Sequence, residues 1–85
     1  MQPIRNIHFT LLIRAANRLR EFNFRKRSSS LYDTDVSDDR GNRFFFKMIL
    51  ENDKWQPQGS NLPYWVTDDN TVIHESLAAR DLELA

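Results

Sequence analysis

The stretch YDTDVSDDRGNRFFFKMILEN, residues 32–52, decides the fold class because its character alternates at every second residue. Apolar and charged side chains alternate on both sides of the segment SDDRGN, residues 37–42, as in strands with one buried face. Within that segment Gly41 and Asn42 tolerate the positive φ angles that tight turns need. The stretch therefore predicts a β-hairpin with one apolar and one polar face.

The alternation extends backward through a turn at SSS, residues 28–30, into a preceding strand. The predicted buried face comprises Phe22, Phe24, Tyr32, Thr34, Val36, Phe44, Phe46, Met48 and Leu50. Antiparallel pairing keeps this set on one face only if paired residue numbers have an even sum. Sums near 58 and 80 place Asp33 opposite Arg25 in one hairpin and opposite Lys47 in the next, and they place Asp35 opposite Phe45. Opposite charges paired across strands stabilise a sheet by up to about 1 kcal/mol.

Helical patterns flank this meander. Residues 4–20 place apolar side chains on one side at a helical period, and residues from about 71 place Ile73, Leu77 and Leu84 on one face. The segment KWQPQ, residues 54–58, predicts a short edge strand, because Pro57 lacks a backbone N–H. We therefore predict one α+β domain over residues 1–85. It has an N-terminal helix, a three- to four-stranded antiparallel meander and a C-terminal helix, with both helices packed on one sheet face.

Charge is divided unevenly along a chain whose net charge is zero. Residues 1–30 carry seven basic residues against one acidic residue, and residues 31–85 carry five against eleven. Pairing between the two halves explains this division, but a basic half also predicts an alternative function, nucleic-acid or other polyanion binding. The candidates for that function are Arg14, Arg18, Arg25, Lys26 and Arg27. The predicted element order is that of double-stranded-RNA-binding domains, but the acidic start of the second helix would repel phosphates.

Other chemistries find little support. The chain has no cysteine, and neither Asp33 nor Asp35 starts a loop with the glycine and glutamate that an EF-hand requires. No nucleophile motif is present, and His8 is expected on the apolar side of the first helix. We therefore predict no catalytic residues, no metal site and no cofactor. The N-terminal apolar run is too short to span a membrane, which favours a cytoplasmic protein, although arginine-rich residues 1–20 also fit a mitochondrial presequence.

The remaining hypothesis is a non-catalytic protein-interaction module. Phe45 and Ile49 occupy the polar face of the meander, beside Arg43 and Lys47, and apolar residues within a charged rim are typical of partner sites. The segment LPYWV adds two further candidates, Tyr64 and Trp65. An alternative is that Trp65 and Trp55 close the end of the core instead. The partner would be an unidentified protein or a second copy of the chain, and we expect neither nucleic acid nor a membrane.

Overall fold

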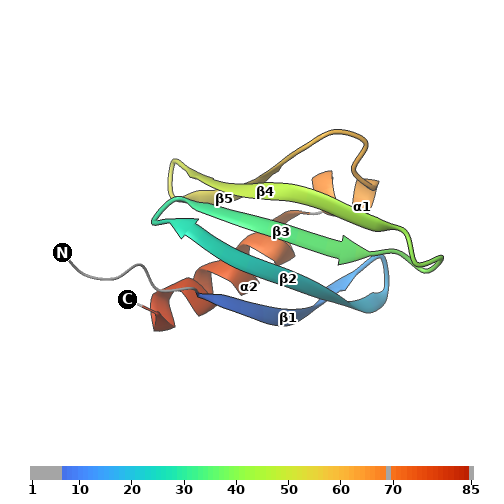
Figure 1. The fold of residues 1–85 in the computed structure, drawn as a ribbon, viewed down its shortest axis with the longest axis horizontal. Helices are drawn as coiled ribbons and strands as arrows, with labels where there is room; N and C mark the ends of the chain where they lie inside the picture. The colour runs from blue at the N-terminus through green and yellow to red at the C-terminus, as the bar shows by residue number, and fades with distance from the viewer. Residues whose placement is uncertain (1–6, 69, 85) are drawn as a thin grey trace.

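The computed structural model describes residues 7–68 and 70–84 of the 85-residue chain. Five strands come first: β1 (His8–Ala15), β2 (Arg18–Ser28), β3 (Leu31–Ser37), β4 (Arg43–Glu51) and β5 (Lys54–Gln58). A single helical turn, α1 (Tyr64–Thr67), and the longer helix α2 (Asn70–Glu83) follow. The strands form one antiparallel sheet in chain order, β1-β2-β3-β4-β5 (Figure 1).

The predicted N-terminal helix is wrong, and so is the fold built on it. Residues 8–15 form β1, in which Ile13 and Ala15 are buried while His8 and Thr10 face solvent. Residues 4–6 of the predicted helix lie outside the described residues. The helical pattern in this segment also satisfies a period of two, and pairing with β2 over the full length of β1 selects the strand. The same pairing places residues 8–20, which belong to the stretch that also fits a presequence, in the first hairpin of the sheet.

Two hairpins close through two-residue turns that the sheet's twist favours. Ala16 and Asn17, between β1 and β2, have φ angles of 52° and 63°. Asn52 and Asp53, between β4 and β5, have the same two values. Positive φ at both central positions defines the type I′ turn, whose twist matches that of the flanking strands. The Asn-Asp turn joins two segments that were both predicted as strands, whereas the Ala-Asn turn lies inside the segment that was predicted as a helix.

The predicted strand registers are confirmed. Arg25 lies opposite Asp33, which lies opposite Lys47 on its other side. Asp35 lies opposite Phe45, and β5 is an edge strand that contains Pro57. The sheet has five strands rather than three or four because β1 pairs with β2 from the other side.

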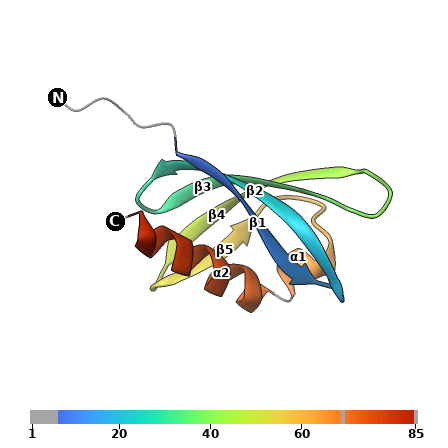
Figure 2. The same cartoon turned by 90° about the horizontal axis from the view of Figure 1, so that it is seen from below.

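One face of the curled sheet is covered by α2, which contacts the two edge strands, β1 and β5. Figure 2 shows the helix on one side of the sheet and no helix on the other. The sheet thus forms a half-barrel, and α2 covers its concave side, where Ile73 and Leu77 are fully buried. Leu84, predicted on the same helical face, is exposed beyond the end of the helix. A single hydrophobic cluster joins α2 to the predicted even-numbered strand face.

Polar contacts fix the position of α2. The Nδ1 atom of His74 accepts a hydrogen bond of 2.9 Å from the backbone N–H of Trp55. Near the other end of the helix, Asp81 accepts hydrogen bonds from the Lys26 ammonium, at 2.7 Å, and the Tyr32 hydroxyl, at 2.6 Å. Burial, with help from Asp81, raises the pKa of Tyr32 far above its usual value. Partial burial alone would raise the pKa of Asp81, but these two hydrogen bonds outweigh it and lower the pKa.

The opposite end of the core is closed by α1. Trp65, 6% exposed, packs edge-on against Phe22 and Phe44, and Trp55 is also buried. The alternative that Trp65 closes the end of the core is confirmed, so Trp65 is not available to a partner. Trp55 is buried elsewhere in the core, against Tyr32. Arg20 lies over the Trp65 ring, 4.2 Å from its centroid, and donates through Nε to the carbonyl oxygen of Ala15 at 2.9 Å.

Candidate binding groove on the open sheet face

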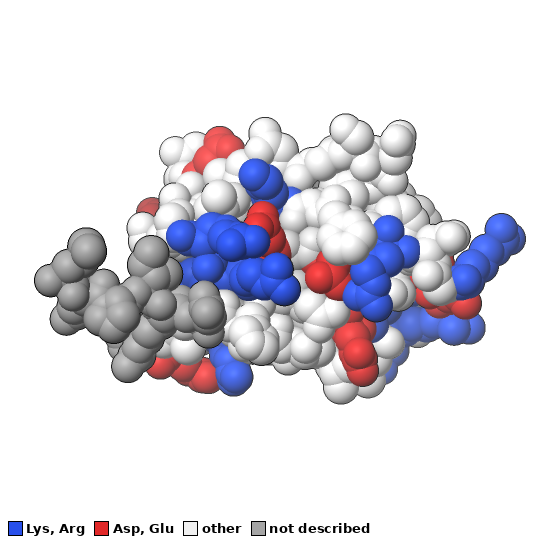
Figure 3. Space-filling model, viewed as in Figure 1, with Lys and Arg blue, Asp and Glu red and all other residues white. Residues whose placement is uncertain are grey.

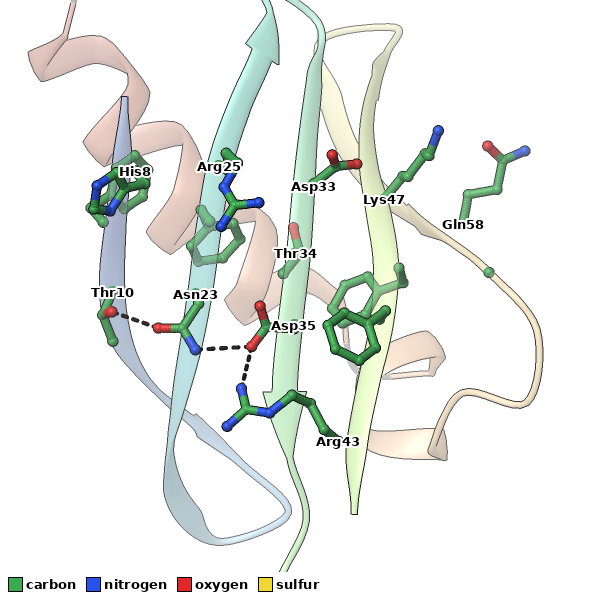
Figure 4. A pocket seen from close by; sticks show the side chains of 15 residues that line it. His8, Thr10, Asn23, Arg25, Asp33, Thr34, Asp35, Arg43, Lys47 and Gln58 are labelled. Atoms are coloured by element: carbon green, nitrogen blue, oxygen red, sulfur yellow. Dashed lines mark hydrogen bonds and ion pairs between the residues drawn. The ribbon is translucent and has the colours of Figure 1, made fainter. Parts of the chain in front are cut away.

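The sheet face opposite α2 contains a shallow groove of about 660 Å³. Its walls are outward-facing side chains from all five strands, shown in Figure 4. We call this surface the open-face groove. It contains His8 and Thr10 from β1, Asn23 and Arg25 from β2, Asp33 and Asp35 from β3, Arg43, Phe45 and Lys47 from β4, and Gln58 from β5.

The antiparallel registers arrange these side chains in rows across the sheet. One row runs His8, Arg25, Asp33, Lys47 and Gln58, each directly opposite the next. Neighbouring strands lie about 4.8 Å apart, so the Cα atoms of Arg25 and Lys47 are separated by roughly 10 Å with Asp33 between them. Arg27, on the same strand as Arg25, forms an ion pair with Asp33.

A second row forms a continuous chain of hydrogen bonds. The Thr10 hydroxyl donates to Oδ1 of Asn23 at 2.6 Å, and the Asn23 amide nitrogen donates to Oδ1 of Asp35 at 2.9 Å. Arg43 completes the chain by donating to the same oxygen of Asp35 (Figure 4). Because Asp35 is held by an amide and a guanidinium, this side of the groove is electrically neutral and structurally fixed.

Phe45 is the exposed apolar side chain of the groove. It is 70% exposed and lies between the charged residues Arg43 and Lys47, on the part of β4 that precedes the pairing with β5. Ile49, four residues farther along β4, is half-buried and lies between Leu31 and Gln56 on the neighbouring strands. Of the six residues predicted for a partner site, Phe45, Arg43 and Lys47 therefore line the groove, and Ile49 lies beyond its end on the same face.

The other two predicted partner residues are not in the groove. Tyr64 is 66% exposed on α1 but is not part of the groove wall, and Trp65 is buried. The sequence could not predict which of the two is buried, because they are adjacent in a single helical turn that exposes one and buries the other.

The predicted polyanion-binding residues do not form one surface. Arg25 and Arg27 lie on the open face, whereas Lys26 faces α2 and is bound to Asp81. Two further residues of that set lie toward the turn that joins β1 to β2. There Arg14 is close to the Asn17 carbonyl oxygen at 3.5 Å, and Arg18 is 3.4 Å from Asp39.

Figure 3 views the molecule from the open face and shows groups of blue basic atoms on either side of a white aromatic ring, with red acidic atoms between them. Both aspartates in the groove are paired with arginines, Asp33 with Arg27 and Asp35 with Arg43. Arg25 and Lys47, by contrast, form no ion pair with any residue in ranges 7–68 and 70–84. The groove is consequently more basic than the chain as a whole.

The acidic turn between β3 and β4 has a structural use. Oδ1 of Asp38 accepts hydrogen bonds from the backbone N–H groups of Arg40 and Asn42, at 2.9 and 2.8 Å. Asp39 forms ion pairs with Arg18 and Arg20. Within the part of the chain that the structure describes, no group of three or more metal-binding side chains is found.

The sequence patterns did not identify His8, Thr10 and Asn23 as residues of the groove. His8 and Thr10 were placed on a helix, and His8 is exposed on β1 rather than partly buried. The signal that could have located them is the alternation in HFTLLIRA, where every second residue is apolar. Asn23 follows from the register, since it lies between Thr10 and Asp35.

Among the helices of the described residues, none is both long and apolar enough to cross a lipid bilayer. Searches with this chain returned no matching family model, no matching curated protein and no matching solved structure.

Proposed function

We propose that this protein is a non-catalytic protein-interaction module whose open-face groove docks a segment of a partner protein. The observation that carries the proposal is the exposure of Phe45 in the groove, on a sheet face that no described element covers. Single exposed apolar residues are common on protein surfaces. An aromatic side chain inside a groove with arginines around it is, however, the composition that is enriched at binding hot spots.

The groove's polar groups favour binding over catalysis. A general base needs a group that is free to accept a proton from a substrate. Both groove carboxylates are instead held by arginines, and Asp35 also accepts from Asn23. These contacts fix a pattern of charges across a rigid sheet, which is what recognition of a complementary surface requires.

The position of the acidic residues favours a protein over nucleic acid, the alternative function. Asp33 and Asp35 stand on the central strand, in the middle of the face. A phosphate backbone carries a negative charge at every nucleotide and depends on a continuous run of cations, but in the described residues only Arg25 and Lys47 of the groove lack an ionic partner. A protein segment carries charges of both signs as well as apolar side chains, so it can match this mixed surface.

Selection from a phage-displayed peptide library on the immobilised protein tests the proposal. Enriched peptides should bind the wild type and should bind Phe45→Ser about tenfold more weakly or worse, as expected for a central aromatic contact. Tyr64→Ser is the matched control, because it removes an exposed aromatic side chain outside the groove. Failure to enrich any peptide, or equal binding to Phe45→Ser, would contradict the proposal.

A second copy of the chain is the other occupant to be tested. Sedimentation velocity at several protein concentrations should show whether the wild type self-associates and whether Phe45→Ser combined with Ile49→Thr prevents it. A dimer that the double substitution abolishes would replace the foreign partner by a homodimer through the same face.

A further inference from the structure

The charge balance of the open-face groove defines the chemistry of its partner. Asp33 and Asp35 are neutralised by Arg27 and Arg43, so Arg25 and Lys47 are the two cations of the groove that have no ionic partner among the described residues. They stand in one row, on either side of Asp33. The groove therefore presents two separate positive charges on a background that is otherwise balanced.

The spacing of these cations matters. The Cα atoms of Arg25 and Lys47 lie roughly 10 Å apart across the strands, and both side chains are long and exposed. Two carboxylates on one side of an extended peptide, two residues apart, are separated by about 7 Å, which the reach of the two side chains accommodates. His8, directly opposite Arg25, adds a further donor at the β1 end of the row.

The groove also contains an apolar contact next to this row. Phe45 precedes Lys47 by two residues on β4, so both side chains project from the same face. An aromatic or aliphatic side chain two residues from an acidic residue lies on the same side of an extended ligand, so it can cover Phe45 while the carboxylate reaches Lys47.

From these observations we infer that the groove binds an extended acidic peptide segment of the partner, in which glutamate or aspartate and an apolar residue occupy alternate positions on the same side of the segment. Arg25 and Lys47 hold the carboxylates, and Phe45 packs against the apolar side chain. This inference rests on the proposed function and specifies the chemistry of the ligand.

Fluorescence anisotropy with defined peptides tests it. The probe is a fluorescein-labelled peptide of Glu-Ser-Glu-Ser-Phe-Ser repeats, which places the acidic and aromatic side chains on one side, and the comparison peptides have Gln-Ser-Gln-Ser-Phe-Ser or Glu-Ser-Glu-Ser-Ser-Ser repeats. The acidic aromatic probe should bind the wild type more tightly than either comparison peptide and more weakly as salt rises. Arg25→Ala combined with Lys47→Ala should weaken its binding about tenfold, the combined effect of two exposed ion pairs.

The matched control is Arg40→Ala combined with Lys54→Ala, which removes the same charge from exposed positions outside the groove. The control should bind the probe within about twofold of the wild type. All four positions are exposed, so thermal unfolding should verify that each variant stays folded.

The outcomes separate the inference from the proposed function. Equal binding of the Gln-Ser-Gln-Ser-Phe-Ser and Glu-Ser-Glu-Ser-Phe-Ser peptides, or equal losses of affinity in both double variants, would overturn the acidic ligand. The Phe45-dependent peptides from phage selection would still support the module. Binding of a labelled single-stranded oligonucleotide, but of no peptide, with loss in Arg25→Ala/Lys47→Ala, would overturn both in favour of polyanion binding. Tight, groove-dependent binding of the acidic aromatic probe supports both.

Discussion

The adjacent phenylalanines of β4 offer the sharpest test of the fold. Phe46 is 5% exposed and faces the core, whereas Phe45 is 70% exposed and faces the groove. The two residues have the same chemistry and belong to the same strand, so they differ only in the sheet face they occupy. Phe46→Ala and Phe45→Ala are therefore matched perturbations of the two faces.

The expected magnitudes follow from burial. Removing a buried phenylalanine side chain costs about 3–5 kcal/mol, whereas surface substitutions usually stay within about 0.5 kcal/mol. A domain of this length has a total stability of roughly 4–13 kcal/mol, so Phe46→Ala should remove a large share of it. In a domain this small, such a loss lowers Tm by at least about 12 °C.

Urea unfolding followed by tryptophan fluorescence is a suitable assay, because Trp55 and Trp65 are both buried in the folded state. The comparison should be made at equal m-values, which show that both variants unfold from equally compact states. A loss above about 1.5 kcal/mol for Phe45→Ala, or below about 1 kcal/mol for Phe46→Ala, would refute the assignment of faces. The groove, the proposed function and the acidic ligand would then fail together.

Three further predictions concern the core and its polar contacts. The Oγ1 atom of Thr34 is buried without a hydrogen-bond partner in the described residues. Thr34→Val should therefore raise the free energy of unfolding by about 1 kcal/mol in urea titrations. A decrease would show that the hydroxyl has a hydrogen-bond partner in the folded state. Arg20→Met should lower the free energy of unfolding by about 2–3 kcal/mol in the same assay. Arg20 is 8% exposed, and the substitution removes both its hydrogen bond to a backbone carbonyl and its contact with Trp65. A loss under about 0.5 kcal/mol would contradict this role. The pKa of Asp81 is lowered in the folded state, so its stabilising effect is complete above the ordinary aspartate pKa of about 4 and is lost as pH falls through the lowered value. Asp81→Asn should therefore cost about 1.5 kcal/mol near neutral pH, and this difference from the wild type should shrink in acid; a difference that does not change with pH would assign the effect to packing rather than to the charge that binds Lys26.

Part of the fold could be predicted because its pattern has only one structural solution. From Phe22 to Leu50 apolar residues recur at alternate positions, and no helix accommodates that period. Shifting a strand by one residue would expose the whole apolar set, so the parity of each register followed from the sequence. The same alternation predicts the polar face, on which Phe45 lies between Arg43 and Lys47.

Residues 8–20 had two solutions, and only tertiary structure chose between them. Phe9, Leu11 and Ile13 satisfy a strand, while the leucines and alanines of the same segment also satisfy a helix. Local propensity is weak compared with tertiary context. The strand is more stable than the helix here because it pairs with β2 and packs against α2 at one edge of the half-barrel. The groove needs that strand, since His8 and Thr10 form its β1 wall.

Whether an aromatic residue outside the strands is buried or exposed likewise depends on tertiary contacts. Tyr64 and Trp65 are neighbours, and nothing in the segment LPYWV indicates which of them points inward. The Arg20 guanidinium and the rings of Phe22 and Phe44 enclose Trp65, and these groups meet only when the sheet has curled. Alternation along one strand determines a face from the sequence, whereas contacts between segments far apart in the chain exist only after the chain has folded.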